Sequence, residues 1–391
     1  MEKKKFIIHN KLAFYTGLIY FIVMALFVGL KVCAYFKLLN FAGADYFYKI
    51  VVQIGFMALL PLVLFPLFTK NNFKQTCERF SFRKISGKAV LISFALGICA
   101  FIIIGYISSL WSGFLSLFGY KFSSSSGGDY SVLSFILSII FVGILPGICE
   151  EIAHRGLILG GTKQNGAIRS ILLCGLLFGL MHFNPTQFGY AFVAGMLFSF
   201  VTLLTRSIFP AMIMHFTNNT LSTITSYSQN SEWFPSTVTD WLNKFFASGN
   251  TFLIIIFNFI LITLTITIFI YLVPKLFTEG KRAEFHRFRK NLKKQLAGTE
   301  LETEIDINNK QQIMEIYQQA NFLNFEQKLK EGKIKNELNT KLTLKNTFEL
   351  ILSDDFTLPE KRKPSDYIFY YCAIFLGAAG TILMFILNLI S

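Results

Sequence analysis

The sequence predicts an all-α membrane protein: a polytopic helical bundle of about nine spans, with a polar, helical cytoplasmic insertion before the last span. Composition is the first reason, because 53% of the 391 residues are hydrophobic and only 15% are charged, whereas soluble domains carry roughly a quarter charged residues. Apolar runs of membrane-crossing length are the second. The third is a formal net charge of +14 carried by segments that flank these runs, which favours basic cytoplasmic loops. We therefore expect membrane lipid as a partner and no nucleic acid.

Nine apolar runs are close to the roughly 20 residues that cross a bilayer, apart from a shorter fifth run. They are residues 12–36, 50–69, 88–112, 131–162, 167–184, 187–206, 208–227, 251–274 and 367–390. The fourth run is longer than a bilayer requires, which indicates a tilted helix or an extension into the cytoplasm.

With nine spans, the basic segments all fall on the same side of the membrane. They are the N-terminal tail, residues 70–88, Lys163 with Arg169, Arg206 and residues 275–294. The intervening loops are poor in Lys and Arg, so the positive-inside rule predicts a multi-pass protein of the cell membrane with a cytoplasmic N-terminus and an outside C-terminus. No small-residue cleavage site follows a short apolar core near the N-terminus, so the first span is expected to remain.

Composition divides the chain into five segments. They are 1–130, the N-terminal transmembrane helices; 131–227, a transmembrane core; 228–274, an outer loop and the eighth span; 275–366, a cytoplasmic polar domain; and 367–391, the last transmembrane helix. The polar domain is rich in Lys and Glu with apolar residues at helical intervals. Its basic stretch "KRAEFHRFRKNLKKQL" is either one face of a solvated helix, with His286 on the surface, or an amphipathic helix on anionic lipid. A cytoplasmic protein partner would bind through 275–366.

The stretch "GICEEIAHRG" places charged residues where lipid penalises charge. Glu151 and Arg155 are four residues apart, share one helix face and are expected to form an ion pair. Glu150 is rotated by about 100° and lacks that partner, which leaves it available for proton transfer. Pro146 and Gly147 just before it would bend the helix and admit water.

Two further spans carry polar residues at helical spacing. In "FGLMHFNP", Phe178 lies four residues before His182, and in "PAMIMHFTNN", His215 lies four before Asn219. Each pattern alone fits a packing residue or a hydrogen bond between helices, and Asn218 is assigned to that class. Their joint occurrence with the Glu-Glu-Arg motif favours a functional site.

Taken in order, Glu-Glu-x-x-x-Arg (Glu150, Glu151, Arg155), Phe-x-x-x-His and His-x-x-x-Asn resemble the CPBP intramembrane proteases. This family contains the CAAX-prenyl-protease and bacteriocin-processing relatives and is also called Abi. The resemblance covers about residues 130–227. It implies an intramembrane endopeptidase acting on a membrane-associated peptide or protein, lipidated or not, and makes 131–227 the catalytic core.

The resemblance also assigns roles to six candidate catalytic residues. They are Glu150, Glu151, Arg155, His182, His215 and Asn219. Glu150 would be the general base on a water that His182 helps to hold, while Glu151 and Arg155 hold the helix and orient Glu150. His215 and Asn219 would donate hydrogen bonds to the oxyanion.

Metal dependence is left open, because family mechanisms have been described both as glutamate-type and as metal-dependent. One Glu and two His residues could bind zinc. The favoured interpretation has no cofactor and no metal ligand, with zinc as the alternative.

Two features depart from the expected pattern. His154 stands where the family usually has an aromatic residue, and it is either a packing residue or an additional proton carrier or ligand near Glu150. The span limits also place Glu150 in the inner half of its helix and His182 near the outer end of its own. The proposed site requires a tilt of the fourth span that brings them level.

Two other function classes fit the same predicted fold. A non-proteolytic scaffold, or an immunity or signalling partner, would depend on residues 275–366 rather than on Glu150. A transporter would use the buried Glu and His residues as a proton or ion relay. It would be expected to have broken helices in matching halves of the chain, and no internal repeat is visible in the sequence.

Overall fold

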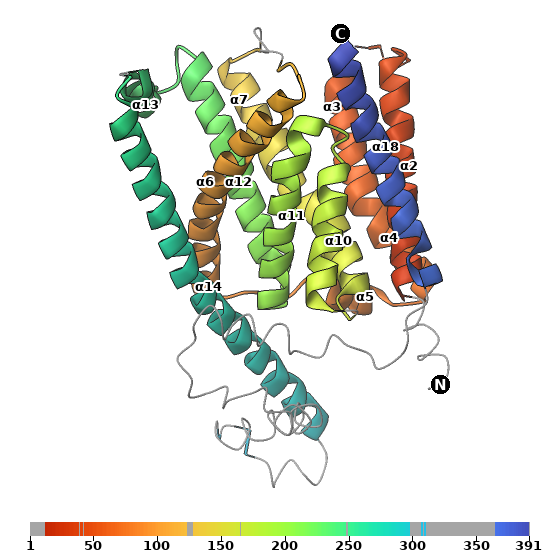
Figure 1. The fold of residues 1–391 in the computed structure, drawn as a ribbon. Coiled ribbons are helices and arrows are strands. Elements are labelled where there is room, and N and C mark those ends of the chain that lie inside the picture. Colours follow the sequence, from red (N-terminus) through yellow and green to blue (C-terminus); the bar gives the residue numbers. More distant parts are fainter. Residues whose placement is uncertain are drawn as a thin grey trace.

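The structure is a computed structural model of the chain. It describes residues 12–390 except for 39, 42, 123–127, 165, 248, 298–305, 308 and 310–363. The described residues form helices and connecting segments, with no strand among them. The predicted all-α polytopic bundle is confirmed (Figure 1).

Eighteen helical segments follow one another along the described chain. They are α2 (Leu12–Tyr35), α3 (Ala44–Ile50), η1 (Val51–Leu59), α4 (Leu60–Thr69), α5 (Phe73–Arg79), α6 (Gly87–Leu117), α7 (Val132–Ser138), η2 (Ile139–Ile144), α8 (Leu145–Glu151), η3 (Ile152–Ile158), α9 (Leu159–Thr162), α10 (Ala167–Leu180), α11 (Pro185–Thr205), α12 (Phe209–Asn230), α13 (Thr237–Ala247), α14 (Thr251–Leu296), η4 (Pro364–Tyr367) and α18 (Ile368–Ile390).

Seven of the described helices are long and apolar enough to cross a membrane, which makes this an integral multi-pass membrane protein. They are Leu12–Tyr35, Ala44–Thr69, Gly87–Leu117, Val132–Thr162, Pro185–Thr205, Thr251–Lys294 and Pro364–Ile390. The other two predicted spans are helices as well. However, α10 has only 14 residues and α12 is rich in Ser, Thr and Asn. Both of these helices carry candidate site residues, so the two least lipid-like helices belong to the site.

Packing places α10 along α11, α6 against α12 and α14, and α18 against α2 (Figure 1). A close backbone approach joins α10 to α11, where a Cβ on Gly195 would lie 2.8 Å from the Cα of Gly175. Small residues allow such backbone contact between membrane helices. As a result, the Gly195 carbonyl comes close to the centre of the bundle.

Two of the long apolar helices contain π-helical stretches. The segment η1 lies between α3 and α4, while η2 and η3 lie on either side of α8. A π turn adds a residue to the helical repeat, changes which side chains share a face, and is frequent at functional sites. All three segments reach the candidate site.

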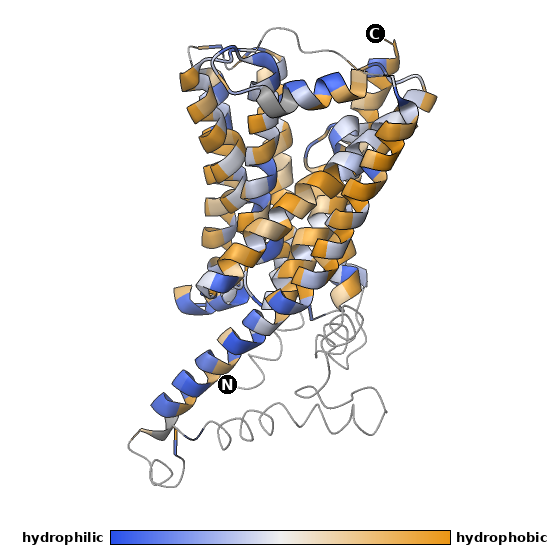
Figure 2. Cartoon of the chain, turned by 90° about the vertical axis from the view of Figure 1, so that its left-hand side faces the viewer, coloured by the Kyte–Doolittle hydropathy of each residue, from blue (hydrophilic) through white to orange (hydrophobic). Residues whose placement is uncertain are grey.

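The last part of α14 leaves the bundle as a continuation of the same helix (Figure 2). The predicted boundary at residue 275 therefore falls inside a 46-residue helix, and the basic stretch 281–296 is its polar end. Lys, Arg, Glu and Leu favour helix, which allows α14 to continue beyond Pro274. Ser86 donates a 2.7 Å hydrogen bond to Glu279, which ties α14 to the start of α6. Most of the predicted polar domain lies outside the described residues.

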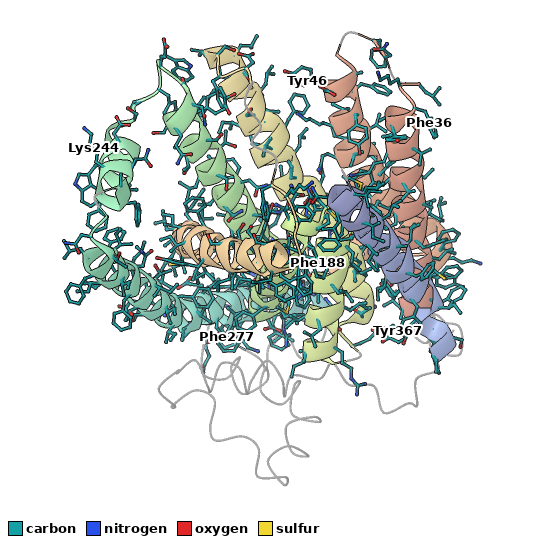
Figure 3. All side chains as sticks on the ribbon, turned by 45° about the horizontal axis from the view of Figure 1, so that its top comes forward. Phe36, Tyr46, Phe188, Lys244, Phe277 and Tyr367 are labelled. Atoms are coloured by element: carbon teal, nitrogen blue, oxygen red, sulfur yellow. The ribbon has the colours of Figure 1, made fainter. Side chains whose placement is uncertain are left out.

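Aromatic side chains lie at both ends of the bundle, and basic side chains distinguish one end from the other. Phe36 and Tyr46 lie at one end, and Phe277 and Tyr367 lie toward the other (Figure 3). Aromatic residues at both ends are typical of the two membrane interfaces. We call the second end the basic end, because α4 ends there at Lys70 and because Lys163 and Arg206 lie there. That this end faces the cytoplasm stays a prediction.

Candidate active site

The short helix α8 carries the paired carboxylates into the interior of the bundle. Glu150 is 5% exposed and Glu151 is fully buried. Pro146 lies within the continuous helix Val132–Thr162 and has no N–H to donate to the preceding turn. A Cβ on Gly147 would lie 3.2 Å from the backbone of Phe216. Glycine at this position therefore lets α8 approach α12, the helix that carries His215.

The Glu151 carboxylate accepts hydrogen bonds from two buried side chains, those of Arg155 and His215. Its Oε1 accepts a hydrogen bond from Arg155 Nη1 at 2.8 Å, so the predicted ion pair is confirmed. The same oxygen lies 2.8 Å from His215 Nδ1. Because an ionised carboxylate only accepts, we assign the Nδ1 hydrogen to His215. Arg155 Nη2 donates to the Gly195 carbonyl at 3.0 Å. Glu151 thus bonds to both Arg155 and His215, and its role in orienting Glu150 stays a prediction.

Phe178 is the aromatic centre of the cluster. The Arg155 guanidinium lies 4.6 Å from the centre of its ring and 5.3 Å from that of Phe198. The ring centres of His182 and His215 lie 5.5 and 5.6 Å from that of Phe178, both in edge-to-face geometry. The predicted packing of Phe178 against His182 is therefore present. Phe178 also brings both histidines into one cluster, as the predicted site requires.

Glu150 faces two side chains from other helices. Its Oε1 accepts a 2.7 Å hydrogen bond from Gln53 Nε2, and its Oε2 lies 4.0 Å from His215 Nε2. A single oxygen atom beside the line that joins Glu150 Oε2 and His215 Nε2 can lie within hydrogen-bond distance of both. Gln53 was not predicted. Its signal in the sequence is a lone amide in the apolar run "KIVVQIGFMALL", and polar residues within spans are functional candidates.

His182 lies just beyond α10, at the edge of this cluster. Its backbone carbonyl accepts a 3.4 Å hydrogen bond from Lys31 Nζ of α2. Among the described residues, its ring nitrogens have no hydrogen-bond partner and do not contact Glu150. The imidazole therefore remains available to a molecule that enters the site.

Asn219 connects α12 to the π segment before α8. Its Nδ2 donates a 2.9 Å hydrogen bond to the carbonyl of Val142 in η2. Its Oδ1 accepts a 3.0 Å hydrogen bond from Asn218. The predicted interhelical role of Asn218 is thus filled by Asn219, which keeps its second amide hydrogen for another acceptor.

Both ring nitrogens of His154 have partners within the protein. Nε2 lies 3.0 Å from the Tyr20 hydroxyl, and Nδ1 lies 2.7 Å from the backbone carbonyl of Glu150. His154 is fully buried and contacts the Phe178 ring. This geometry favours the packing interpretation over that of an additional proton carrier.

The donor set does not match a catalytic zinc site. Such sites use three protein ligands, and within the described ranges no group of three or more His, Cys, Asp or Glu side chains is placed to hold a metal ion. His215 Nδ1 is engaged by Glu151, which leaves Nε2 and the Glu150 carboxylate as a pair. The chemistry below therefore contains no metal step.

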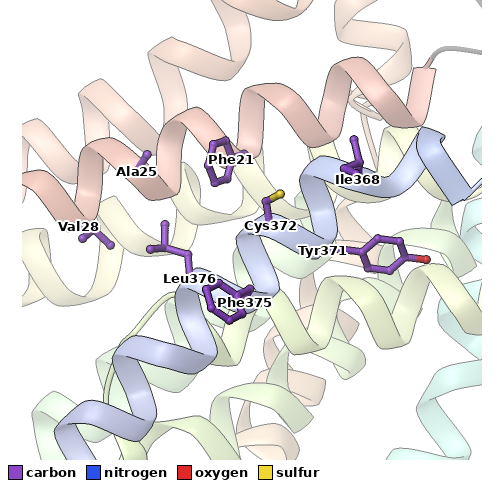
Figure 4. A pocket seen from close by; sticks show the side chains of 8 residues that line it. All are labelled: Phe21, Ala25, Val28, Ile368, Tyr371, Cys372, Phe375 and Leu376. Atoms are coloured by element: carbon purple, nitrogen blue, oxygen red, sulfur yellow. The ribbon is translucent and has the colours of Figure 1, made fainter.

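An apolar hollow of about 620 Å³ lies apart from these residues, between α2 and α18 (Figure 4). Its lining residues are Phe21, Ala25, Val28, Ile368, Tyr371, Cys372, Phe375 and Leu376. None of them belongs to the charged cluster, so the candidate site is the buried Glu150 region and not this hollow.

The fold and the site together define an integral membrane protein with buried carboxylate, imidazole and guanidinium groups at the centre of its helical bundle. Residues 132–221 match the family model described as Rce1-like, type II CAAX prenyl endopeptidase Rce1-like. This segment contains all six predicted site residues, and the resemblance to the CAAX-protease family is confirmed. No curated protein and no solved structure matches the chain.

Proposed function

We propose that this protein is a glutamate-type intramembrane endopeptidase that hydrolyses a peptide bond of a membrane-associated peptide or protein. One observation carries the proposal. Glu150 Oε2 and His215 Nε2 face each other across 4.0 Å, so one oxygen beside the line that joins them can hydrogen-bond to both. The family match over residues 132–221 supports the same class of reaction.

The first step is attack by water. Glu150 takes a proton from the water as its oxygen bonds to the scissile carbonyl carbon, and the carbonyl oxygen becomes an oxyanion. The protonated Glu150 then passes this proton to the amide nitrogen as the carbon–nitrogen bond breaks. The products are a carboxyl group and an amine, and Glu150 returns to its carboxylate form.

His215 stabilises the oxyanion in this scheme. Glu151 accepts from Nδ1, so a proton on Nε2 makes an imidazolium whose charge Glu151 balances. The Nε2 hydrogen then points at the developing negative charge, and a donor placed in advance lowers the barrier. The second amide hydrogen of Asn219 is the additional donor. His182, whose ring is otherwise unbonded among the described residues, holds the water or the substrate carbonyl.

The test compares peptides released from membranes that contain the native chain with those released by Glu150→Gln. This variant keeps the size of the side chain but removes the base, so we expect product to fall about 10²–10⁴-fold. Glu78→Gln is the matched control, because the Glu78 side chain is 60% exposed on α5. Identical peptide sets from native and Glu150→Gln proteins of equal abundance would refute the proposal.

A further inference from the structure

We propose that Gln53 completes the site by holding the Glu150 carboxylate with its amide N–H and accepting a hydrogen of the attacking water with its amide oxygen. This inference rests on the function proposed above. It adds a residue outside the family match, since Gln53 lies on η1 and the match begins at residue 132.

The first step of the argument is the contact itself. Gln53 Nε2 donates to Glu150 Oε1 at 2.7 Å, across 97 positions of the chain. The segments η1 and α8 pack directly against each other, so the bond joins two neighbouring helices. By occupying Oε1, Gln53 leaves Oε2 as the oxygen that faces His215 and takes the proton.

The second step concerns the other atom of the same amide. Gln53 Oε1 is buried and has no hydrogen-bond partner in the described part of the chain. A buried amide oxygen without a partner is costly, so such an atom normally bonds to another group or to an ordered water. Because Oε1 and Nε2 share one carbon and Nε2 bonds to Glu150, a single water can reach both Oε1 and the Glu150 carboxylate. A water there gives one hydrogen to Glu150 and the other to Gln53.

The third step is the type of side chain. A carboxylate or a hydrocarbon at this position could not donate to Glu150, and a cation would hold the Glu150 carboxylate in its charged form and weaken it as a base. A neutral amide both donates and accepts, so it fixes the carboxylate and the water without adding charge.

The experiment measures kcat and KM for a peptide that the native protein cleaves. Gln53→Leu is expected to lower kcat about 10–100-fold, because the water and the base lose their orientation, with KM within about twofold. Gln187→Leu is the matched control, since Gln187 is a half-buried amide at the start of α11 and is not among the site residues. Its kcat is expected to equal the native value.

A second variant separates the role in the reaction from folding. Gln53→Met keeps the length of the side chain but loses both the N–H donor and the amide oxygen, so kcat is again expected to fall with KM retained, even if Gln53→Leu is unstable. Native kcat in folded Gln53→Met or Gln53→Leu protein, with Glu150→Gln inactive, would overturn the inference. Full activity of Glu150→Gln would instead refute the proposed function, so the two failures are distinguishable.

Discussion

The centre of the bundle and its basic end both gather charged side chains, yet the two regions balance their charges differently. At the centre, Arg155 and His215 both bond to Glu151, and Glu150 faces the other nitrogen of His215. Two carboxylates thus lie next to one guanidinium and one imidazole, so the acidic and basic groups are equal in number. These four side chains are at most 5% exposed.

At the basic end, cations lie near other cations. Burial first, and then the charges of Arg83, Arg79 and Arg206, together lower the pKa of Lys163 to about 7. Lys163 Nζ donates to Ser81 Oγ at 3.3 Å, which is a neutral partner. Glu284 bonds to Arg206, so part of this charge is compensated.

This difference reflects the surroundings of the two regions. Inside the membrane no water can solvate an isolated charge, so each charge needs a partner from the protein. At the end of the bundle, water and anionic lipid head groups can interact with charges that have no partner from the protein. Loss of one partner is therefore expected to affect stability far more at the centre than at the basic end.

The largest expected effect comes from Arg155→Met. It leaves Glu151 as a buried charge without its guanidinium, and breaking such a pair costs about 3–5 kcal/mol in the free energy of unfolding. The double variant Arg155→Met with Glu151→Leu removes both charges and should lose less. Unfolding in detergent measures both proteins. A single variant as stable as the double variant would show that the centre does not depend on pairing.

The next effect concerns activity. His215→Asn removes the imidazole that faces Glu150, and the loss of one oxyanion donor lowers kcat about 10²–10³-fold. Lys163→Met, at the basic end, is the comparison and should retain native kcat. Steady-state kinetics on one peptide distinguish the two variants, and equal kcat values for both would argue against a role for His215 in the reaction.

The candidate residues could be predicted because polar groups stand out in apolar runs. Glu151 and Arg155 are four residues apart on one helix, and the spacing alone predicted their ion pair. The all-α class followed in the same way from the length of the runs. Both predictions depend on local sequence, and the structure confirms both.

Contacts between helices could not be predicted in this way. Gln53 and Glu150 are 97 positions apart, and His215 and Glu151 are 64 apart, so no spacing rule relates either pair. The π segments add to the difficulty, because they change the faces that a regular repeat of 3.6 residues predicts. Spacing along the chain therefore indicated Glu151 as a candidate residue but not its contact with His215.

A smaller effect is expected at Lys163. Its pKa is about 7 in the folded chain and near 10.5 for an unperturbed lysine. Between these values the unfolded chain holds a proton that the folded chain has released, so stability rises as pH increases from about 7 to about 10.5. Lys163→Met should remove this rise and stabilise the protein at pH 7 by about 1 kcal/mol, less than the full shift implies because the side chain is partly exposed. Unfolding at several pH values measures this, and an unchanged pH dependence in the variant would contradict it.

The smallest expected effect is that of metal removal. Within the described residues, no group of three or more His, Cys, Asp or Glu side chains is placed to hold a metal ion, and His215 Nδ1 is engaged by Glu151. A catalytic zinc site uses three protein ligands, so this donor set favours a reaction without zinc. Peptide release is therefore expected to be unchanged after treatment with EDTA or phenanthroline. Inactivation by the chelator and recovery on addition of zinc would contradict this prediction and would show that Glu150 acts through a metal-bound water.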